Sequence, residues 1–276
     1  MNGSDANFDR YLYILGVSKL GPSWQALTEL TSAHLIRIPF ENISKIRRAK
    51  IQGIRNIPSL EEYLDGIEHF NFGGTCFVNN YYLHLLLIYL GYEVKLCGAD
   101  ISENGAPPDG HMANVVTVDG REAIVDVGFG APFWHPIPRD STTEIKIQLG
   151  ELLYVLKPKD NEGHSRLEIY RDEQLIFGYL LKPAARKVED FAEVIARSYT
   201  ESAPLLNYLL LVRYFRDGAV RLINRSFTEV NGSESRIQKL ATIEEIINVI
   251  EGRFGIPAHI VSEVIGSLGE TKIFVS

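Results

Sequence analysis

Cysteine is scarce in this chain, with only Cys76 and Cys97 among 276 residues. Two cysteines cannot form the set of disulfide bonds that stabilises a small extracellular domain. They lie twenty-one residues apart, so they also lack the close Cys or His pairing of a structural zinc site. We therefore expect neither a disulfide framework nor a bound metal.

Long apolar runs and an excess of basic charge are missing too. No apolar stretch reaches the roughly 18 residues of a membrane-spanning helix, and the first residues lack the pattern of a secretory signal peptide. The net charge of −7 offers no overall positive field for nucleic acid or an anionic membrane. The basic cluster "KIRRAK", Lys45–Lys50, is most simply a solvated loop, with phosphate binding as the alternative. We expect a cytoplasmic protein that binds neither nucleic acid nor membrane.

The spacing of the apolar residues changes along the chain. Up to Gly91 they recur at helical intervals, with Ser23 placed to cap one helix and Ser59 and Glu62 in the register of a capping box. After Gly91, short β-rich runs alternate with turns, which predicts strands, and a further helical segment follows over residues 188–199. Because the helices come first and the strands after them, the order predicts an α+β protein.

The clearest strand pattern is "HMANVVTVDGREAIVDVGFG", which contains a favoured two-residue hairpin turn at Asp119-Gly120. Such a turn brings His111 and Asp126 onto the same face as diagonal neighbours, about 7–8 Å apart at the backbone. An aspartate on an apolar strand is costly to bury alone, and a histidine partner removes that cost. We therefore predict that His111 and Asp126 form a pair. The pattern alone leaves open whether the pair has a chemical role. A second turn is predicted at Asp217-Gly218.

The stretch "GGTCF" places Cys76 where a helix begins. Two glycines permit a tight backbone before it, and the long apolar run after it predicts a largely buried helix. The free amides and dipole of a helix N-terminus stabilise a thiolate and can hold an oxyanion. A lone cysteine can equally be an inert core residue. With His111 and Asp126, however, Cys76 completes a nucleophile, a base and a group that orients the base.

The other histidines lack such a context, and most are interpreted as surface or helix-packing residues. They are His34, His69, His84, His135, His164 and His259.

These residues together resemble the arylamine N-acetyltransferase family. The resemblance runs over most of the chain and includes "RIPFENI" (residues 37–43), "GGTCF" (residues 73–77) and the hairpin motif. Cys76, His111 and Asp126 follow in the family's order, at spacings of 35 and 15 residues.

The resemblance implies an α+β fold with a cysteine-protease-like Cys-His-Asp core. The implied parts are a helical bundle over residues 1–92 that carries Cys76, a β-barrel over 93–186 that carries His111 and Asp126, and an α/β lid over 187–276.

It also implies acetyl transfer in two halves. Cys76 would take an acetyl group from acetyl-CoA, and the acetyl-Cys76 intermediate would pass it to an arylamine, arylhydrazine or N-hydroxyarylamine. No metal is implied, and we expect a monomer or weak homodimer. The residues that match the family's acceptor pocket are Phe40, Phe129 and Tyr208, and those in its CoA-proximal loop are Gly130 and Ala131.

Two positions depart from the family pattern. Phe72 and Ile14 stand where relatives usually carry arginines that surround the glutamate of "PFEN", here Glu41. A buried Glu41 without these partners should have a raised pKa or a substitute hydrogen-bond donor. With the three chemical residues intact, we expect activity with an altered rate or acceptor range.

Three other functions stay open from the sequence. An amide synthase of the same family would close an aromatic amine onto a thioester-bound chain, and a wider pocket near Phe129 and Tyr208 would favour it. A Cys-His-Asp hydrolase would use water or lysine as the acceptor. A binding module would keep the fold but lose the chemistry through Phe72 and Ile14.

Overall fold

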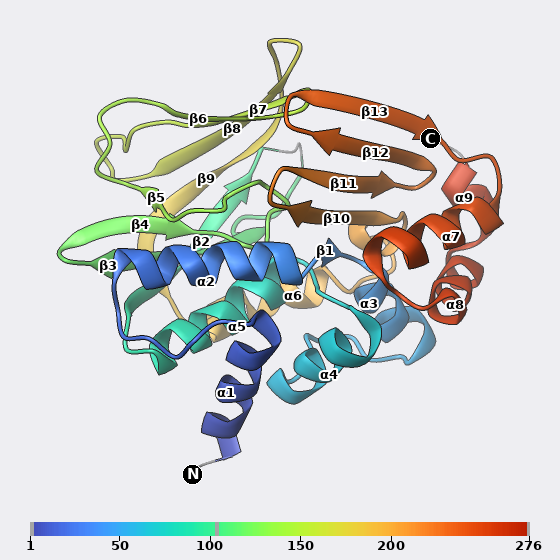
Figure 1. Ribbon diagram of the computed structural model, residues 1–276, viewed down its shortest axis with the longest axis horizontal. Coiled ribbons are helices and arrows are strands. Elements are labelled where there is room, and N and C mark those ends of the chain that lie inside the picture. The colour runs from blue at the N-terminus through green and yellow to red at the C-terminus, as the bar shows by residue number, and fades with distance from the viewer. Residues whose placement is uncertain (1–2, 103–104, 275–276) are drawn as a thin grey trace.

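The computed structural model describes residues 3–102 and 105–274, and its mixture of helices and antiparallel sheets confirms the α+β prediction (Figure 1). The helices are α1 (Gly3–Leu15), α2 (Trp24–Arg37), α3 (Ile43–Ile46), α4 (Leu60–Phe70), α5 (Cys76–Tyr89), α6 (Ala192–Arg197), α7 (Ile243–Phe254), α8 (Ala258–Leu268) and α9 (Glu270–Phe274). Short turns of π or 3-10 helix lie at η1 (Arg47–Ile51), η2 (Val188–Phe191) and η3 (Pro204–Leu206).

An eight-stranded antiparallel sheet forms the middle of the molecule. Its strands, in spatial order, are β5 (Ile137–Pro138), β4 (Arg121–Val125), β3 (His111–Val118), β2 (Glu93–Ile101), β9 (Gln174–Arg186), β8 (Ser165–Arg171), β7 (Leu152–Leu156) and β6 (Ile145–Leu149). The sheet has two edge strands, β5 and β6, and takes the form of a half-barrel. Helix α5 packs against β2 and β3, so the start of α5 lies close to the β3–β4 hairpin.

A five-stranded antiparallel sheet joins distant parts of the chain. Its order is β1 (Phe40–Glu41), β10 (Leu210–Phe215), β11 (Gly218–Ile223), β12 (Ser226–Asn231) and β13 (Glu234–Lys239). In Figure 1 it lies beside the half-barrel, with α7 to α9 next to it on the right and α1 to α5 below the sheets. Because β1 pairs with β10 and also bridges to Gly74, the backbone just ahead of Cys76 is joined to the C-terminal part of the chain.

Cys76 lies where two apolar cores meet. One buried cluster joins α2 and α5 to the half-barrel and includes Leu83 of α5. A second cluster surrounds α3, α7, α8 and the five-stranded sheet, and it contains Cys76 and Phe77. The first turn of α5 therefore belongs to one core and the rest of the helix mainly to the other.

The first predicted hairpin turn is confirmed. Val118 pairs with Arg121, so the two loop residues are Asp119 and Gly120, with φ of 51° and 73°. Two successive positive φ values are those of the turn that Asp-Gly favours. The ladder runs to Asn114–Val125, one residue short of Asp126, and keeps the expected register throughout.

The second predicted turn is wrong by one residue. Phe215 pairs with Gly218, so the loop is Arg216–Asp217 and Gly218 already belongs to β11. A Cβ at Gly218 would lie 2.0 Å from the carbonyl oxygen of Val230 on the next strand. Glycine is present here because the neighbouring backbone comes close, and the turn does not require it.

The predicted helix starts are confirmed at two positions. Ser23 accepts a hydrogen bond from Ala26 N at the start of α2, and Ser59 and Glu62 form the complete capping box of α4. The expected loop over Lys45–Lys50 is instead helical, in α3 and η1. Ile46 and Ala49 are buried and lie three residues apart, on one face of a helix, and packing of this segment against α8 stabilises a helical backbone.

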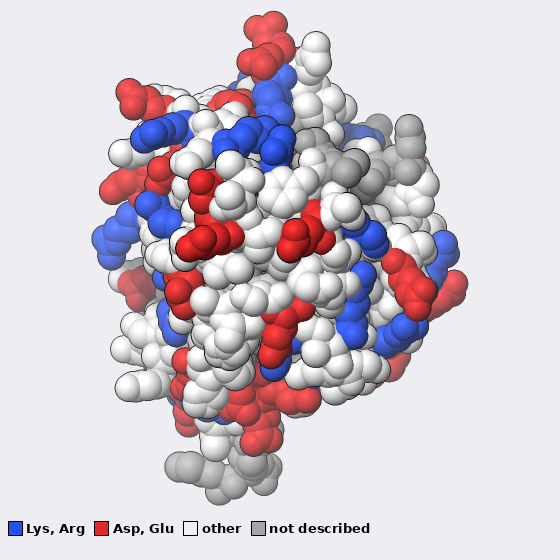
Figure 2. Space-filling model, turned by 90° about the vertical axis from the view of Figure 1, so that its right-hand side faces the viewer, with Lys and Arg blue, Asp and Glu red and all other residues white. Residues whose placement is uncertain are grey.

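Charge is mixed over the surface that carries the C-terminal helices. Figure 2 shows acidic and basic side chains interspersed on this face. Among residues 3–102 and 105–274, no helix combines the length and apolar character needed to cross a bilayer.

A chain of buried polar groups connects α2 to the Cys76 segment. His34 Nε2 lies 2.8 Å from the Tyr11 hydroxyl, which lies 3.5 Å from the hydroxyl of Tyr63. Tyr63 donates to Asn79 Oδ1 at 3.0 Å, and Asn79 Nδ2 donates to the Gly74 carbonyl at 3.1 Å. Burial lowers the pKa of His34 to about 3, so the imidazole is neutral in the folded protein.

The neutral His34 predicts an acid-dependent loss of stability. Unfolded histidine, with pKa near 6.5, binds a proton at pH 5 that folded His34 excludes. Acidification from pH 7.5 to 5 should therefore remove about 2 kcal/mol of unfolding free energy through this residue. His34→Gln should lose about 2 kcal/mol less than wild type over the same interval, as measured by urea unfolding at both pH values. The exposed His69→Gln is the matched control, and equal losses in His34→Gln and wild type would contradict the assignment.

Candidate active site

The backbone ahead of Cys76 is held by the strand β1. Glu41 N donates to the Gly74 carbonyl at 3.1 Å, and the Glu41 carboxylate accepts from Gly73 N at 3.1 Å. A Cβ at Gly73 would lie 1.8 Å from the Pro39 carbonyl oxygen. Only glycine allows the two segments to approach so closely. The contact fixes where α5 starts, and Cys76 is its first residue.

Glu41 has substitute donors in place of arginines. It is fully buried, and its carboxylate accepts from Ser44 Oγ at 2.6 Å and Ser44 N at 3.0 Å, besides Gly73 N. Burial still raises the pKa of Glu41 above its ordinary value. Both consequences expected for a Glu41 without arginine partners are thus present. Phe72 packs against Phe70 with ring centroids 5.3 Å apart, and Ile14 packs on the apolar core.

His111 and Asp126 form a buried pair. His111 Nε2 lies 2.8 Å from Asp126 Oδ2, and both side chains are inaccessible to solvent. The imidazole stacks on Tyr179 at 5.1 Å between centroids and meets the edge of Phe129 at 4.8 Å. The sequence-predicted hairpin thus brings the two residues into direct contact, closer than their backbones alone require.

The surroundings of the pair shift the pKa values of both groups toward their charged forms. Burial disfavours the charged imidazole, but the Asp126 carboxylate and the Cys76 sulfur outweigh it and raise the pKa of His111 to about 10. Burial would likewise raise the pKa of Asp126, yet His111, Asn80 and the Gly128 amide together lower it. His111 Nδ1 is buried and has no hydrogen-bond partner among the described residues. With Nε2 engaged by Asp126, Nδ1 is the nitrogen available to the thiol.

Asn80 connects the cysteine helix to the pair, and the sequence reasoning missed it. Its Nδ2 donates to Asp126 Oδ1 at 2.8 Å and to the Met112 carbonyl at 2.6 Å, while its Oδ1 accepts from Val127 N at 2.9 Å. Asn80 stands four residues after Cys76, on the same face of α5. An amide side chain in an apolar run that predicts a buried helix was the signal that could have revealed it, because a buried amide needs hydrogen-bond partners.

Gly128 allows the hairpin and α5 to meet. A Cβ there would lie 2.6 Å from Asn80 Nδ2 and 2.8 Å from the Cys76 Cα. Its amide also donates to Asp126 Oδ1 at 3.0 Å. The first two residues after Asp126 therefore close the site around the cysteine.

Three residues were predicted to line the acceptor pocket: Phe129 lies beside His111, and Phe40 and Tyr208 lie on or next to the paired strands β1 and β10. Phe129 borders His111 and stacks on Phe177 at 5.4 Å, with an interplanar angle of 8°. Phe40 lies on β1, and its ring is 3.6 Å from the position a Cβ of Gly130 would take. Tyr208 is half-buried just before β10, and its carbonyl accepts from Asn42 Nδ2 at 2.6 Å.

The two predicted CoA-loop residues differ in exposure. Gly130 is partly exposed, with φ of 72°, and its carbonyl accepts from the Tyr214 hydroxyl. Ala131 is buried in the core, so its methyl group contacts protein.

Two aromatic residues were also missed: Tyr179, which stacks on His111, and Phe177, which stacks on Phe129. Phe177 and Tyr179 alternate along β9, so both side chains point to the face of the sheet that carries the site. Their period-two spacing in "IFGYLL" was visible in the sequence, but nothing there places β9 next to β2, one strand away from β3.

The other cysteine is a core residue. Cys97 is fully buried in β2, and burial raises the pKa of its thiol to about 11. In residues 3–102 and 105–274, no group of three or more His, Cys, Asp or Glu side chains is arranged to hold a metal ion.

Comparison with known proteins identifies the family to which this chain is similar. The model of the N-acetyltransferase family matches residues 23–262. The proansamycin X synthase of Amycolatopsis mediterranei is 24% identical over 90% of this chain and 98% of its own length. The pineal gland arylamine N-acetyltransferase NAT-10 of Gallus gallus is 28% identical over 65% of this chain and 66% of its own.

Solved structures share the fold. The arylamine N-acetyltransferase of Mycobacterium abscessus superposes with a TM-score of 0.80, at 18% identity, over 97% of this chain and 96% of its own. That of Mycobacterium marinum, solved in complex with CoA, gives 0.78 at 22% identity, over 96% and 98%.

The buried pair makes a direct prediction for Asp126→Asn. Without the carboxylate, burial dominates and the pKa of His111 falls, so imidazole NMR should find His111 charged at pH 8 in wild type and neutral in the variant. Alkylation of Cys76 at neutral pH should slow by about tenfold or more, the effect of one pKa unit of lost stabilisation. The matched control is Asp140→Asn, an exposed aspartate paired with Arg121. Unchanged titration and alkylation in Asp126→Asn would refute the assigned coupling.

Proposed function

The chain belongs to the arylamine N-acetyltransferase family, and from that membership we propose that it transfers an acetyl group from acetyl-CoA to an aromatic amine. Arylamines, arylhydrazines and N-hydroxyarylamines are the proposed acceptors. The observation that carries the proposal is the position of Cys76, at the start of α5, against Gly128, two residues after Asp126 of the buried His111–Asp126 pair.

The first half of the reaction loads the cysteine. His111 Nδ1 takes the thiol proton, and Asp126 stabilises the imidazolium that results. The Cys76 thiolate attacks the thioester carbon, and the backbone amide of Cys76 is the proposed donor to the oxyanion. The C–S bond to CoA then breaks, His111 returns the proton to the departing CoA sulfur, and acetyl-Cys76 remains.

The second half of the reaction transfers the acetyl group from Cys76 to the amine. The amine nitrogen attacks the acetyl carbon of the thioester while His111 accepts an amine proton. The bond to Cys76 breaks, the acetylated amine leaves, and the thiolate–imidazolium pair is restored.

Aromatic side chains favour a flat acceptor. Phe129 and Tyr179 pack against His111, Phe177 stacks on Phe129, and Phe40 lies beside Gly130. Rings of this kind bind an aromatic amine by stacking and edge contacts. For the donor, the CoA complex of the Mycobacterium marinum relative supports a CoA thioester. Gly130 and Ala131 are proposed to lie near the CoA, with Gly130 offering the accessible backbone.

A second candidate is an amide synthase of the same family. The observation that favours it is the match to proansamycin X synthase, which extends over nearly all of that protein. The same Cys76 chemistry would then act on a chain that carries both the thioester and the aromatic amine, with ring closure replacing transfer.

Replacing the nucleophile tests the proposal. Cys76→Ser should reduce acetylation of an aromatic amine or hydrazine by at least about 10³-fold, because the hydroxyl is hardly ionised at neutral pH. The variant should stay folded, since the change removes little volume. Cys97→Ala is the matched control and should keep its turnover, and retained turnover in pure Cys76→Ser would exclude the mechanism.

The choice of substrate separates the candidates. The main proposal predicts fast transfer from acetyl-CoA to a free aromatic amine and slow hydrolysis when no amine is present. Fast closure of a long thioester that ends in an aromatic amine, with little transfer from acetyl-CoA, would favour the synthase. Fast hydrolysis would favour a hydrolase.

A further inference from the structure

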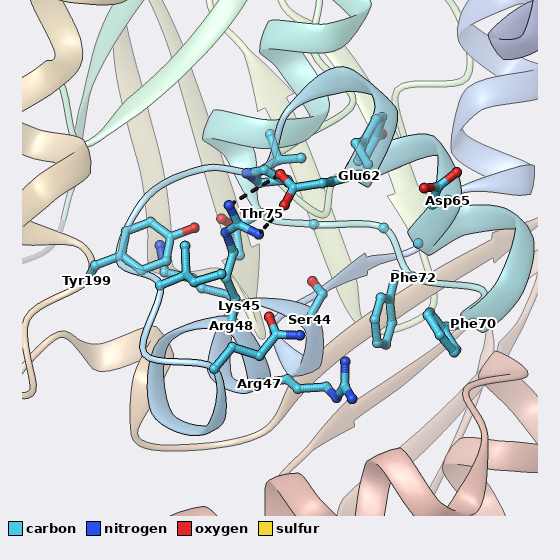
Figure 3. A pocket seen from close by; sticks show the side chains of 18 residues that line it. Ser44, Lys45, Arg47, Arg48, Glu62, Asp65, Phe70, Phe72, Thr75 and Tyr199 are labelled. Carbon is cyan, nitrogen blue, oxygen red and sulfur yellow. Dashed lines mark hydrogen bonds and ion pairs between the residues drawn. The ribbon is translucent and has the colours of Figure 1, made fainter. Parts of the chain in front are cut away.

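The imidazole of His111 is fully covered in this structure. Its side chain has no accessible surface, although an amine acceptor must reach it to give up a proton. Cys76 is only 8% exposed. A cavity of about 260 Å³ lies beside the Cys76 segment, but of the described residues that line it Thr75 is the nearest along the chain to the cysteine, and neither Cys76 nor His111 takes part (Figure 3). An acceptor therefore reaches His111 only when a side chain that covers the imidazole moves.

Two aromatic rings pack on the imidazole, and they differ in how firmly they are held. Tyr179 stacks on His111 and is itself fully buried. Phe129 meets His111 edge-on, with ring centroids 4.8 Å apart, yet it is only half-buried. Moving a half-buried ring disrupts fewer packing contacts than moving a fully buried one. Phe129 is therefore the cover that opens more readily.

Phe177 holds Phe129 in the covering position. The two rings are nearly parallel, at 8°, with centroids 5.4 Å apart. Their planes can be no farther apart than their centroids, whereas a third ring between them would need about 7 Å, two contact distances of about 3.5 Å. No acceptor ring fits between them as they stand. Phe177 is half-buried like Phe129, so both rings of the stack have part of their surface in solvent.

A β-bulge lies next to Phe177. Phe177 pairs with Ile169 of β8. The next pair is Leu175 with Tyr170, which leaves Ile176 as an extra residue on β9. A bulge bends the strand and re-aims the neighbouring side chains, and bulges are frequent beside active sites. Two residue pairs separate this bulge from the turn of the hairpin, so the Phe177 ring lies near the free end of β8 and β9, where it can move without disrupting the rest of the sheet.

We propose that Phe177 sets the width of the acceptor site by holding Phe129 over His111 until an aromatic ring displaces the stack. This role rests on the proposed function, since the acceptor in question is the one that takes the acetyl group from Cys76. A single-ring amine needs a small displacement of the stack, whereas a fused-ring amine needs the Phe177 ring to leave it. The chain thus favours single-ring amines, and loss of the Phe177 ring admits wider ones.

Two thiol reagents of different width test this role without an acyl donor or an amine. Iodoacetamide is narrow, and pyrene maleimide carries a wide fused-ring system. Phe177→Ala should raise the rate at which pyrene maleimide alkylates Cys76 by about tenfold, the effect of removing one aromatic contact from the barrier. The rate with iodoacetamide should hardly change, because a narrow reagent needs no displaced ring. Peptide mapping separates the Cys76 adduct from any at the buried Cys97.

A neighbouring residue provides the matched control. Ile176 is 45% exposed and is the extra residue of the same bulge, so Ile176→Ala should leave both alkylation rates at their wild-type values. Phe177→Leu keeps an apolar side chain on the strand and should act in the same direction as Phe177→Ala. Unchanged pyrene maleimide alkylation in folded Phe177→Leu, an equal gain in Ile176→Ala, or an equal gain with both reagents would overturn the proposal.

Turnover gives a second readout that separates this role from the proposed function. With acetyl-CoA as donor, Phe177→Ala should raise the ratio of kcat/KM for aminofluorene to kcat/KM for aniline by about tenfold. An active enzyme in which this ratio stays at the wild-type value would overturn the role of Phe177 alone. A protein that transfers no acetyl group, yet shows the change in pyrene maleimide alkylation, would refute the proposed function and still support Phe177 as the residue that sets the width of the site.

Discussion

The buried contact between His111 and Asp126 is the interaction on which the rest of the site depends. Two charged groups removed from water are stable only when each has partners, and here nearly every partner comes from a different element. Asp126 accepts from His111 of β3, Asn80 of α5 and the Gly128 amide. The hydrogen bonds that compensate the carboxylate therefore also fix the distance between the cysteine helix and the hairpin. Stability and chemical geometry have the same origin.

A second constraint fixes the cysteine from the other side. The Gly73–Gly74 backbone lies against β1, and β1 is itself an edge strand of the five-stranded sheet, paired with β10. The Cys76 position is thus set jointly by the N-terminal helices, the half-barrel and the C-terminal sheet. Glu41 contributes to this arrangement by accepting hydrogen bonds from Gly73 and Ser44, so the segment is held without arginine partners for this carboxylate. The division into residues 1–92, 93–186 and 187–276 stays a proposal, and the shared β1–β10 pairing shows how closely the first and last segments are joined.

The sequence predicted those parts of the site whose geometry is set by residues close together in the chain. The register of the β3–β4 hairpin follows from one Asp-Gly turn and the two-residue period of strands, so the pairing of His111 with Asp126 could be predicted without knowing the fold. The start of α5 followed from glycines and an apolar run. Asn80 and Tyr179 could not be identified in this way, because their contacts with Asp126 and His111 arise only when α5 and β9 pack beside the strands that carry the pair. The misplaced turn at Gly218 has a similar cause: the glycine serves a contact with β12 that no neighbouring residue reveals. In "KIRRAK", the charges concealed an apolar face whose partner, α8, lies more than two hundred residues later in the chain.

The most direct test of the account is the intact mass of the protein after mixing with acetyl-CoA in the absence of any acceptor, with peptide mapping of the product. The account predicts one acetyl group per chain, on Cys76, that disappears when an aromatic amine or hydrazine is added. A folded protein that acquires no acetyl group, or acquires it at another residue while Cys76 stays free, would contradict the central claim that Cys76 and the His111–Asp126 pair form one acyl-transfer site.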